Sequence, residues 1–116
     1  MKRRFFLAAV LATALPALAL AHHGWGSYDA ANPITISGPI LTSKYENPHA
    51  TITVQTPAKV WTVILAPTSR MGNRGASRDL VAIGRTVIVE GYASKTEANE
   101  MRAERITVEG KTFELR

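Results

Sequence analysis

The 116-residue sequence contains no cysteine, which excludes disulfide bonds, thiolate metal sites and a cysteine nucleophile. Aromatic residues make up only 7% of the chain, and histidine occurs three times. The formal net charge of +5 is concentrated at the start of the chain. Without residues 1–21, 11 basic residues remain against 9 acidic ones, a net charge of +2. This balance, with so few aromatic residues, disfavours a nucleic-acid-binding protein. The length allows one domain.

The first 21 residues have the layout of a secretory signal peptide. Residues 1–4 form a positive head, residues 5–20 are almost wholly apolar, and Ala19 and Ala21 are the small residues expected before a cleavage site. A membrane anchor is the alternative, but the apolar run is shorter than the roughly 20 residues of a spanning helix and contains Pro16. We therefore expect cleavage near Ala21, a periplasmic or secreted bacterial protein, and no stable membrane span after processing.

Beyond the leader, the sequence divides into short alternating runs rich in β-branched residues, a pattern typical of strands. We expect an N-terminal segment over 22–33, followed by strands over 34–45, 49–56, 60–65, 86–92, 101–108 and 111–115. Gly38-Pro39 indicates a bulge or bend within the first strand. Residues 66–77 are expected to form an exposed loop, and 78–83 a short helix.

This order of elements predicts the fold class. Three strands, one short helix and two or three further strands indicate an all-β domain over 34–116, a small Greek-key β-barrel of the OB type. Closure of the barrel would pair most edge hydrogen-bonding groups without help from disulfides. An unclosed β-sandwich with a similar number of strands is the alternative.

The three histidines are the candidate metal ligands. His22 and His23 are adjacent, and His49 follows Asn47-Pro48. Cleavage after Ala21 would make His22 the first residue, so that its amine and imidazole could chelate one metal ion together. An imidazole from His23 or His49 would supply a third nitrogen. A sulfur-free nitrogen set favours Cu(II), and less selectively Zn or Ni. Binding of this kind is expected to weaken on acidification.

Two alternatives remain for these histidines. Cleavage after Ala19 would place His22 third in the mature chain, where the amine, two amides and the imidazole can bind Cu(II) or Ni(II) in a square plane. The histidines can also have structural roles, with His22 and His23 in a loose polar chain end and His49 in a turn. Trp25 and Asp29 are the expected neighbours of the metal. Asp29 can orient a histidine, or instead bond to local backbone.

Four arginines form the other local concentration, in the loop region at Arg70, Arg74, Arg78 and Arg85. Such a cluster can hold a phosphate or carboxylate ligand. The sequence lacks the glycine pattern that cradles phosphates in recognised loops, and solvated loop charge is the alternative interpretation.

The sequence favours a binding protein over an enzyme. The serines lie in no nucleophile-elbow pattern, and the glutamates look like surface positions. We therefore predict a small periplasmic β-barrel that binds a transition metal, with copper the favoured ion, and no catalytic activity. The alternative is a periplasmic binding module for a small ligand or a protein partner, without metal. A copper-dependent oxidase is a third class, and it requires turnover by the metal-loaded protein.

Several motifs occur together in this chain: His22-His23-Gly24-Trp25 after the leader, Tyr28-Asp29, Gly38-Pro39-Ile40, Asn47-Pro48-His49-Ala50, Trp61-Thr62-Val63 and residues 84–91. With them, essentially the whole mature chain resembles a domain-of-unknown-function family of small exported bacterial proteins. That resemblance implies no activity. The order of elements also resembles that of exported bacterial OB-fold proteins, and such a likeness of fold does not determine function.

Overall fold

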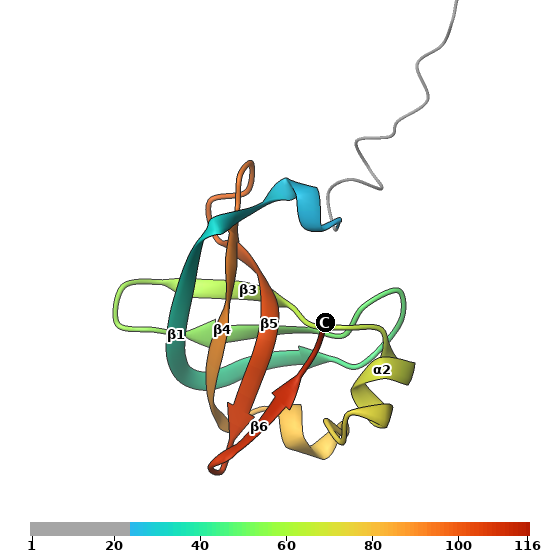
Figure 1. The fold of residues 1–116 in the computed structure, drawn as a ribbon. Coiled ribbons are helices and arrows are strands. Elements are labelled where there is room, and N and C mark those ends of the chain that lie inside the picture. The colour runs from blue at the N-terminus through green and yellow to red at the C-terminus, as the bar shows by residue number, and fades with distance from the viewer. Residues whose placement is uncertain (1–23) are drawn as a thin grey trace, which may run out of the picture.

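The computed structural model describes residues 24–116, so the leader, His22 and His23 lie outside the described residues. The elements, in chain order, are η1 (Trp25–Ser27), β1 (Tyr28–Lys44), β2 (Thr51–Gln55), β3 (Val60–Ile64), α2 (Thr68–Asn73), η2 (Asp79–Val81), β4 (Thr86–Ser94), β5 (Glu100–Val108) and β6 (Lys111–Glu114). The short helical segments α2 and η2 connect β3 to β4 beside the sheet (Figure 1).

The strands form one sheet that closes into a ring. Their order is β3-β2-β1-β4-β5-β6, and a parallel pairing of β3 with β5 joins the two sides. The other neighbouring strands pair antiparallel. This is the connectivity of a five-stranded Greek-key barrel of the OB type, with β6 added beside β5. The predicted barrel is confirmed, and the unclosed sandwich is wrong.

β1 is shared by the two halves of the ring. It pairs with β4 from Pro33 to Pro39 and with β2 from Ile40 to Lys44. Its start at Tyr28 is earlier than the expected start at 34, because the first residues of the strand are polar or exposed and lack an alternating pattern. One register irregularity of β1 lies between Ile40 and Thr42 against β2, just after the expected position, and a second lies between Tyr28 and Pro33 against β4.

Gly38 is needed where β2 ends against β1. A Cβ atom at this position would lie 1.8 Å from the carbonyl oxygen of Gln55, so only glycine permits the approach.

The turn between β5 and β6 has a different backbone requirement. Glu109 and Gly110 both have positive φ, at 51° and 78°, as two-residue hairpin turns require. The predicted hairpin turn at these two residues is confirmed.

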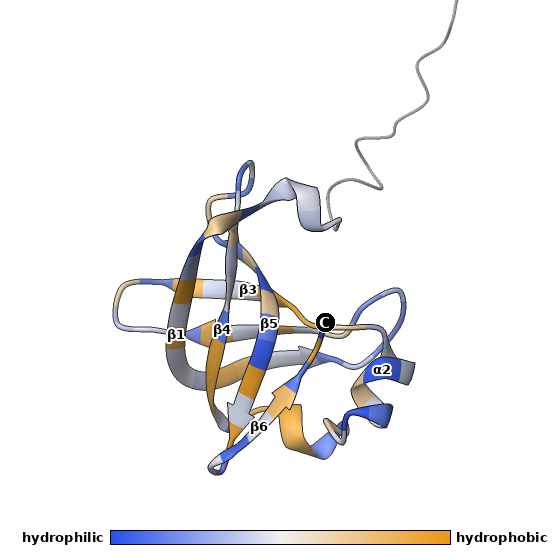
Figure 2. Ribbon diagram, in the orientation of Figure 1, coloured by the Kyte–Doolittle hydropathy of each residue, from blue (hydrophilic) through white to orange (hydrophobic). Residues whose placement is uncertain are grey.

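The core is the apolar interior of the ring. Alternate residues of the strands point inward, including Val54, Val63, Val87, Val89 and Ile106, each fully buried. Figure 2 shows the alternation, with hydrophobic and hydrophilic segments following one another along β1, β4 and β5. Met71 of α2 and Val81 of η2 cover the core from outside the ring. Among residues 24–116, no helix combines the length and apolar character that crossing a membrane requires.

The helix expected over 78–83 is in fact the single 3-10 turn η2, and the α-helix α2 lies earlier, within the expected loop 66–77. Local propensity did not indicate α2, because its last two residues are Gly72 and Asn73. Tertiary contacts hold it instead. Asn47 Oδ1 accepts hydrogen bonds from the backbone N–H of Thr68 at 3.1 Å and from its hydroxyl at 3.0 Å, and Met71 is fully buried.

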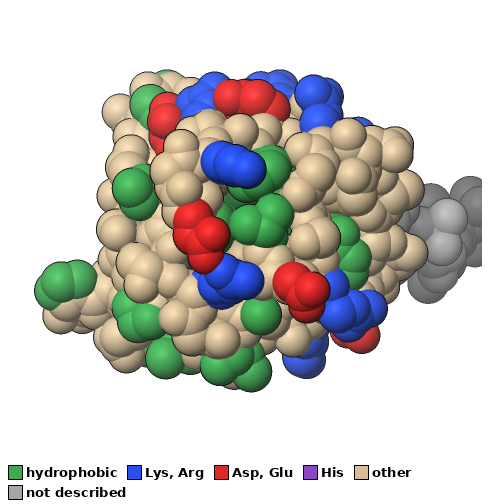
Figure 3. Space-filling view, turned by 90° about the horizontal axis from the view of Figure 1, so that it is seen from below, with side chains coloured by type: hydrophobic (Ala, Val, Ile, Leu, Met, Phe, Trp, Pro, Cys, Tyr) green, Lys and Arg blue, Asp and Glu red, His purple; other side chains and the backbone are tan. Residues whose placement is uncertain are grey.

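The outer surface mixes residue types. Among the residues that the structure describes, four large hydrophobic side chains are exposed, those of Leu41, Val60, Ile83 and Ile88. In the view from below, hydrophobic side chains stand among both basic and acidic ones (Figure 3). This face therefore does not show a broad field of one charge.

Candidate functional site at the Trp25 end of the barrel

Trp25 is the first side chain of the described structure with extensive contacts. The guanidinium carbons of Arg102 and Arg116 each lie 4.5 Å from the centre of its ring. Tyr92 meets the same ring edge-on, with 5.9 Å between the ring centres. Contacts of these kinds contribute roughly 0.5–2 kcal/mol each, more when the cation is desolvated. Trp25 is therefore held to β4, β5 and the end of the chain.

The segment after Trp25 is also tied to the barrel. The backbone N–H of Lys95 donates to the carbonyl of Ser27 at 2.9 Å. The hydroxyl of Tyr28 donates to Glu100 Oε2 at 2.8 Å. Both side chains of that pair are buried, with exposed fractions of 1% and 9%. The start of β1 is thus fixed against the start of β5.

Burial shapes the electrostatics of this end. It raises the pKa of Tyr28 well above its usual range, and the hydrogen bond and negative charge of Glu100 raise it further. Arg102 is only 5% exposed, and burial lowers the pKa of its guanidinium. Electrostatic interaction with Tyr28 opposes that shift, while Arg70 and Arg116 lower the pKa of Arg102 further by repulsion. Arg70 and Arg116 are therefore close enough to Arg102 to act on it electrostatically.

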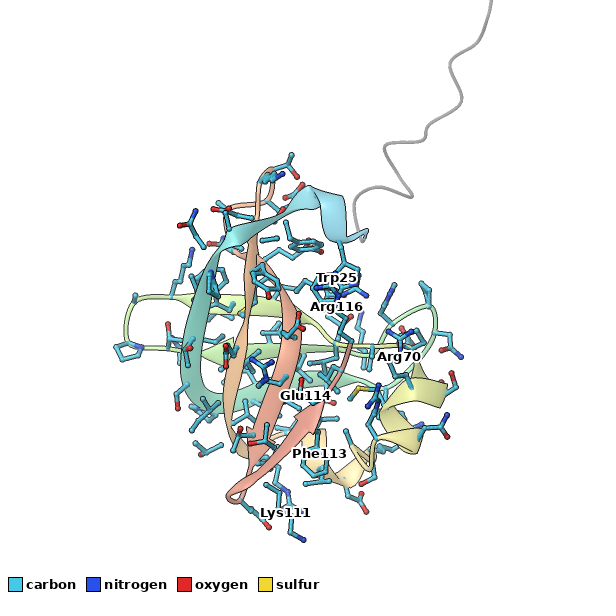
Figure 4. The ribbon with its side chains drawn as sticks, in the orientation of Figure 1. Trp25, Arg70, Lys111, Phe113, Glu114 and Arg116 are labelled. Carbon is cyan, nitrogen blue, oxygen red and sulfur yellow. The ribbon has the colours of Figure 1, made fainter. Side chains whose placement is uncertain are left out.

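Arg70 comes from α2 and Arg116 from the residues after β6. Arg70 Nη1 donates to the carbonyl of Leu115 at 3.5 Å, and Arg74 Nη2 donates to the main-chain oxygen of Arg116 at 3.2 Å. Figure 4 shows Trp25 and Arg116 beside one another, with Arg70 extending toward them from α2. Glu114, Phe113 and Lys111 lie farther along β6 in that view. We call Arg70, Arg102 and Arg116 the arginine cluster.

The structure divides the four arginines that the sequence grouped. Arg70 and Arg74 contact the last residues of the chain. The guanidinium of Arg78 lies 5.2 Å from the ring centre of Tyr45. Arg85 forms an ion pair with Glu109 and donates to the carbonyl of Asp79 at 3.2 Å. Arg70 and Arg74 thus lie together at the end of the chain, whereas Arg78 and Arg85 have other partners.

His49 lies in the loop between β1 and β2. This loop contains a cis peptide bond between Asn47 and Pro48. His49 is partly buried and lines a cleft of about 320 Å³ with Lys44, Glu46, Asn47, Pro48, Thr51 and Ile64. In the part of the chain that the structure describes, no group of three or more His, Asp or Glu side chains is arranged to hold a metal ion. His22 and His23, the other predicted ligands, lie outside that part.

Asp29 has a local contact. Its carboxylate accepts a hydrogen bond of 3.0 Å from Asn32 Nδ2, a contact within its own segment of chain. Its predicted role beside a histidine stays a prediction, because His22 and His23 are not described. Trp25 packs against Tyr92, Arg102 and Arg116, and its predicted role beside a metal likewise stays a prediction.

The sequence analysis missed Arg102 and Arg116. Strict alternation along β5 would turn Arg102 away from the core, and an arginine on an outward face predicts solvent exposure. Arg102 is buried because Trp25, from the other end of the chain, covers it. A contact between residues so far apart in the sequence leaves no local signal. Adjacent positions Met101 and Ala103 are buried too, from the other face of the strand.

Comparison with known proteins agrees with the resemblance noted above. The sequence model of a family of unknown function matches residues 9–102, which include His22, His23 and the barrel as far as Arg102. The chain belongs to DUF6152. Membership in DUF6152 carries no activity with it, since the family's function is unknown. No curated protein matches the sequence significantly.

The barrel of this DUF6152 protein is similar to part of a solved structure, the crystal structure of TiaS in complex with an isoleucine tRNA and ATP. The TM-score is 0.51 and the sequence identity is 18%. The similarity covers 69% of this chain and 18% of that chain. At this identity the likeness is one of fold alone.

Proposed function

We propose that this DUF6152 protein is an exported binding module without catalytic activity that binds Cu(II) at its mature N terminus. The leader pattern supports export to the periplasm or the exterior, with His22 first after cleavage at Ala21. The first residue would offer its amine and imidazole to one ion. His23 or His49 would supply a further imidazole nitrogen.

The observation that carries this proposal is the anchoring of Trp25. Only Gly24 separates it from the histidine pair. Since three side chains hold the Trp25 ring, a terminal chelate would be tethered within a few residues of a fixed point on the barrel. A short tether lowers the entropic cost of recruiting a further donor from the protein. The imidazole of His49 is the histidine nitrogen donor that the barrel would supply to the metal ion.

The test begins with Cu(II) titration of the mature protein purified from the periplasm, with its N terminus established by intact mass. We expect one ion per chain and an electron paramagnetic resonance spectrum of nitrogen ligation. A variant extended by three alanines before His22 separates the amine from the histidines. One or two alanines would not serve, because either would place a histidine third in the chain. The extension is expected to weaken binding by at least about tenfold.

A second pair of variants tests His49. His49→Ala is expected to weaken Cu(II) binding if its imidazole completes the site, whereas Lys44→Ala, in the same cleft, serves as the matched control. Unchanged affinity in His49→Ala would restrict the proposal to a chelate within the terminal segment. The absence of stoichiometric binding to the mature protein would overturn the proposal. So would equal affinity in the alanine-extended variant.

A second candidate function is a binding module that uses no metal. It is favoured by one observation, the gathering of Arg70, Arg102 and Arg116 beside Trp25. Concentrated positive charge attracts anions and disfavours a second cation. Binding of an anion by these arginines would not require copper.

A further inference from the structure

We propose that the arginine cluster, Arg70, Arg102 and Arg116, binds a phosphate group, either free or carried by a small ester. The site would lie on the surface beside Trp25, where Arg70 and Arg116 are exposed and would contact the phosphate. Arg102 is buried against the Trp25 ring and would act through its positive charge. This inference goes beyond the copper proposal and does not depend on it, since none of the three residues is a predicted metal ligand.

The cluster is assembled from three elements that are distant in sequence. Arg70 belongs to α2, Arg102 to β5, and Arg116 follows β6. Arg102 and Arg116 share the Trp25 ring at 4.5 Å each, and Arg70 reaches the carbonyl of Leu115, the neighbour of Arg116. Figure 4 shows two members of the cluster, Arg70 and Arg116, together with Trp25. The fold thus brings three guanidinium groups to one end of the barrel.

Positive charge exceeds negative charge at this place. Arg116 faces Glu104 at 3.7 Å, longer than a charge-assisted hydrogen bond of about 2.8 Å. The nearby carboxylate of Glu100 accepts a hydrogen bond from the hydroxyl of Tyr28. Arg70 is exposed and, among residues 24–116, forms no ion pair with a carboxylate. Because like charges in a partly desolvated site repel, a bound anion would relieve the repulsion.

The geometry favours phosphate over a single carboxylate. A carboxylate is planar and carries one charge, so one guanidinium fork satisfies it. A phosphate group is tetrahedral, carries up to two charges and offers oxygens in several directions. The two exposed guanidiniums, of Arg70 on α2 and Arg116 after β6, can approach such an acceptor from different directions, and the buried charge of Arg102 adds to the attraction. Contact with Trp25 restrains Arg102 and Arg116 in advance, which lowers the entropic cost of binding.

Arg78 provides a matched control for Arg70. Both are exposed arginines in the connection between β3 and β4, and both donate to a main-chain oxygen at 3.5 Å. Arg78 also lies near an aromatic ring, that of Tyr45. The difference that the test uses is that Arg70 lies beside Arg102 and Arg116, whereas Arg78 lies beside Tyr45. Replacing either with glutamine removes the same charge from the protein.

The experiment is a titration of the metal-free mature protein with inorganic phosphate at constant ionic strength. Nuclear magnetic resonance would follow the indole N–H of Trp25. We expect saturable binding, about tenfold weaker in Arg70→Gln and changed less than about twofold in Arg78→Gln. A parallel titration with acetate is expected to show much weaker binding.

Three results would overturn the proposal. The first is the absence of saturable binding of phosphate to the wild-type protein. The second is an equal loss of affinity in Arg70→Gln and Arg78→Gln, which would indicate attraction by net charge alone. The third is binding of acetate as tight as that of phosphate. The metal-free protein is used throughout, so failure here is distinct from failure of the copper proposal.

Discussion

Tyr28 donates a buried hydrogen bond of 2.8 Å to Glu100 across 72 positions of sequence. The bond joins the first residue of β1 to the first residue of β5. It lies close to the site at Trp25, since Arg102, two residues beyond Glu100 on β5, contacts the Trp25 ring. This pair therefore helps to position both the terminal segment and the arginine cluster.

Removal of the Tyr28 hydroxyl tests how much this bond stabilises the fold. Tyr28→Phe leaves the buried carboxylate of Glu100 without that donor, so the free energy of unfolding is expected to fall by about 1–3 kcal/mol. Urea unfolding measures the change. Tyr92→Phe is the control: this tyrosine is half-buried and acts through its ring, so little change is expected. An equal loss of stability in Tyr28→Phe and Tyr92→Phe would contradict a stabilising role for the hydrogen bond between Tyr28 and Glu100.

The raised pKa of Tyr28 predicts a loss of stability at alkaline pH. The unfolded chain releases the phenol proton near its ordinary pKa of 10.0, whereas the folded protein retains it. Above that pH the unfolded state therefore binds fewer protons than the folded state, and stability falls as pH rises. Unfolding measured from about pH 8 to about pH 11 is expected to show a shallower decline in Tyr28→Phe than in wild type. Identical slopes would argue against a buried protonated phenol.

Gly38 and Gly72 predict opposite effects of the same substitution. Gly38→Ala would place a Cβ atom 1.8 Å from the carbonyl oxygen of Gln55 and is expected to destabilise by at least about 2–4 kcal/mol. At Gly72 nothing lies within 4 Å of an added Cβ atom. Because alanine is the better helix former, Gly72→Ala is expected to be neutral or to stabilise by up to about 1 kcal/mol. Thermal unfolding of both variants distinguishes these outcomes.

Most strands could be predicted from the sequence because alternation and β-branched residues are local signals. The runs at 60–65, 86–92 and 101–108 correspond to β3, β4 and β5, with ends shifted by one or two residues. The start of β1 and the position of α2 could not be predicted this way. Residues 29–32 lack alternation, and α2 depends on Asn47 from a distant loop and on the burial of Met71.

The sequence by itself determined the leader pattern, the all-β class and the order of the strands along the chain, since each depends on composition and on periodicity. Closure of the barrel depends on the pairing of β3 with β5, which the tertiary structure decided. Only the tertiary structure decided which arginines meet. It separated Arg70 from Arg78, although both lie in the same connection, and brought Arg70 to Arg102 and Arg116. The physical reason is that ring closure and the packing of Trp25 on β5 bring together side chains whose proximity no local pattern encodes.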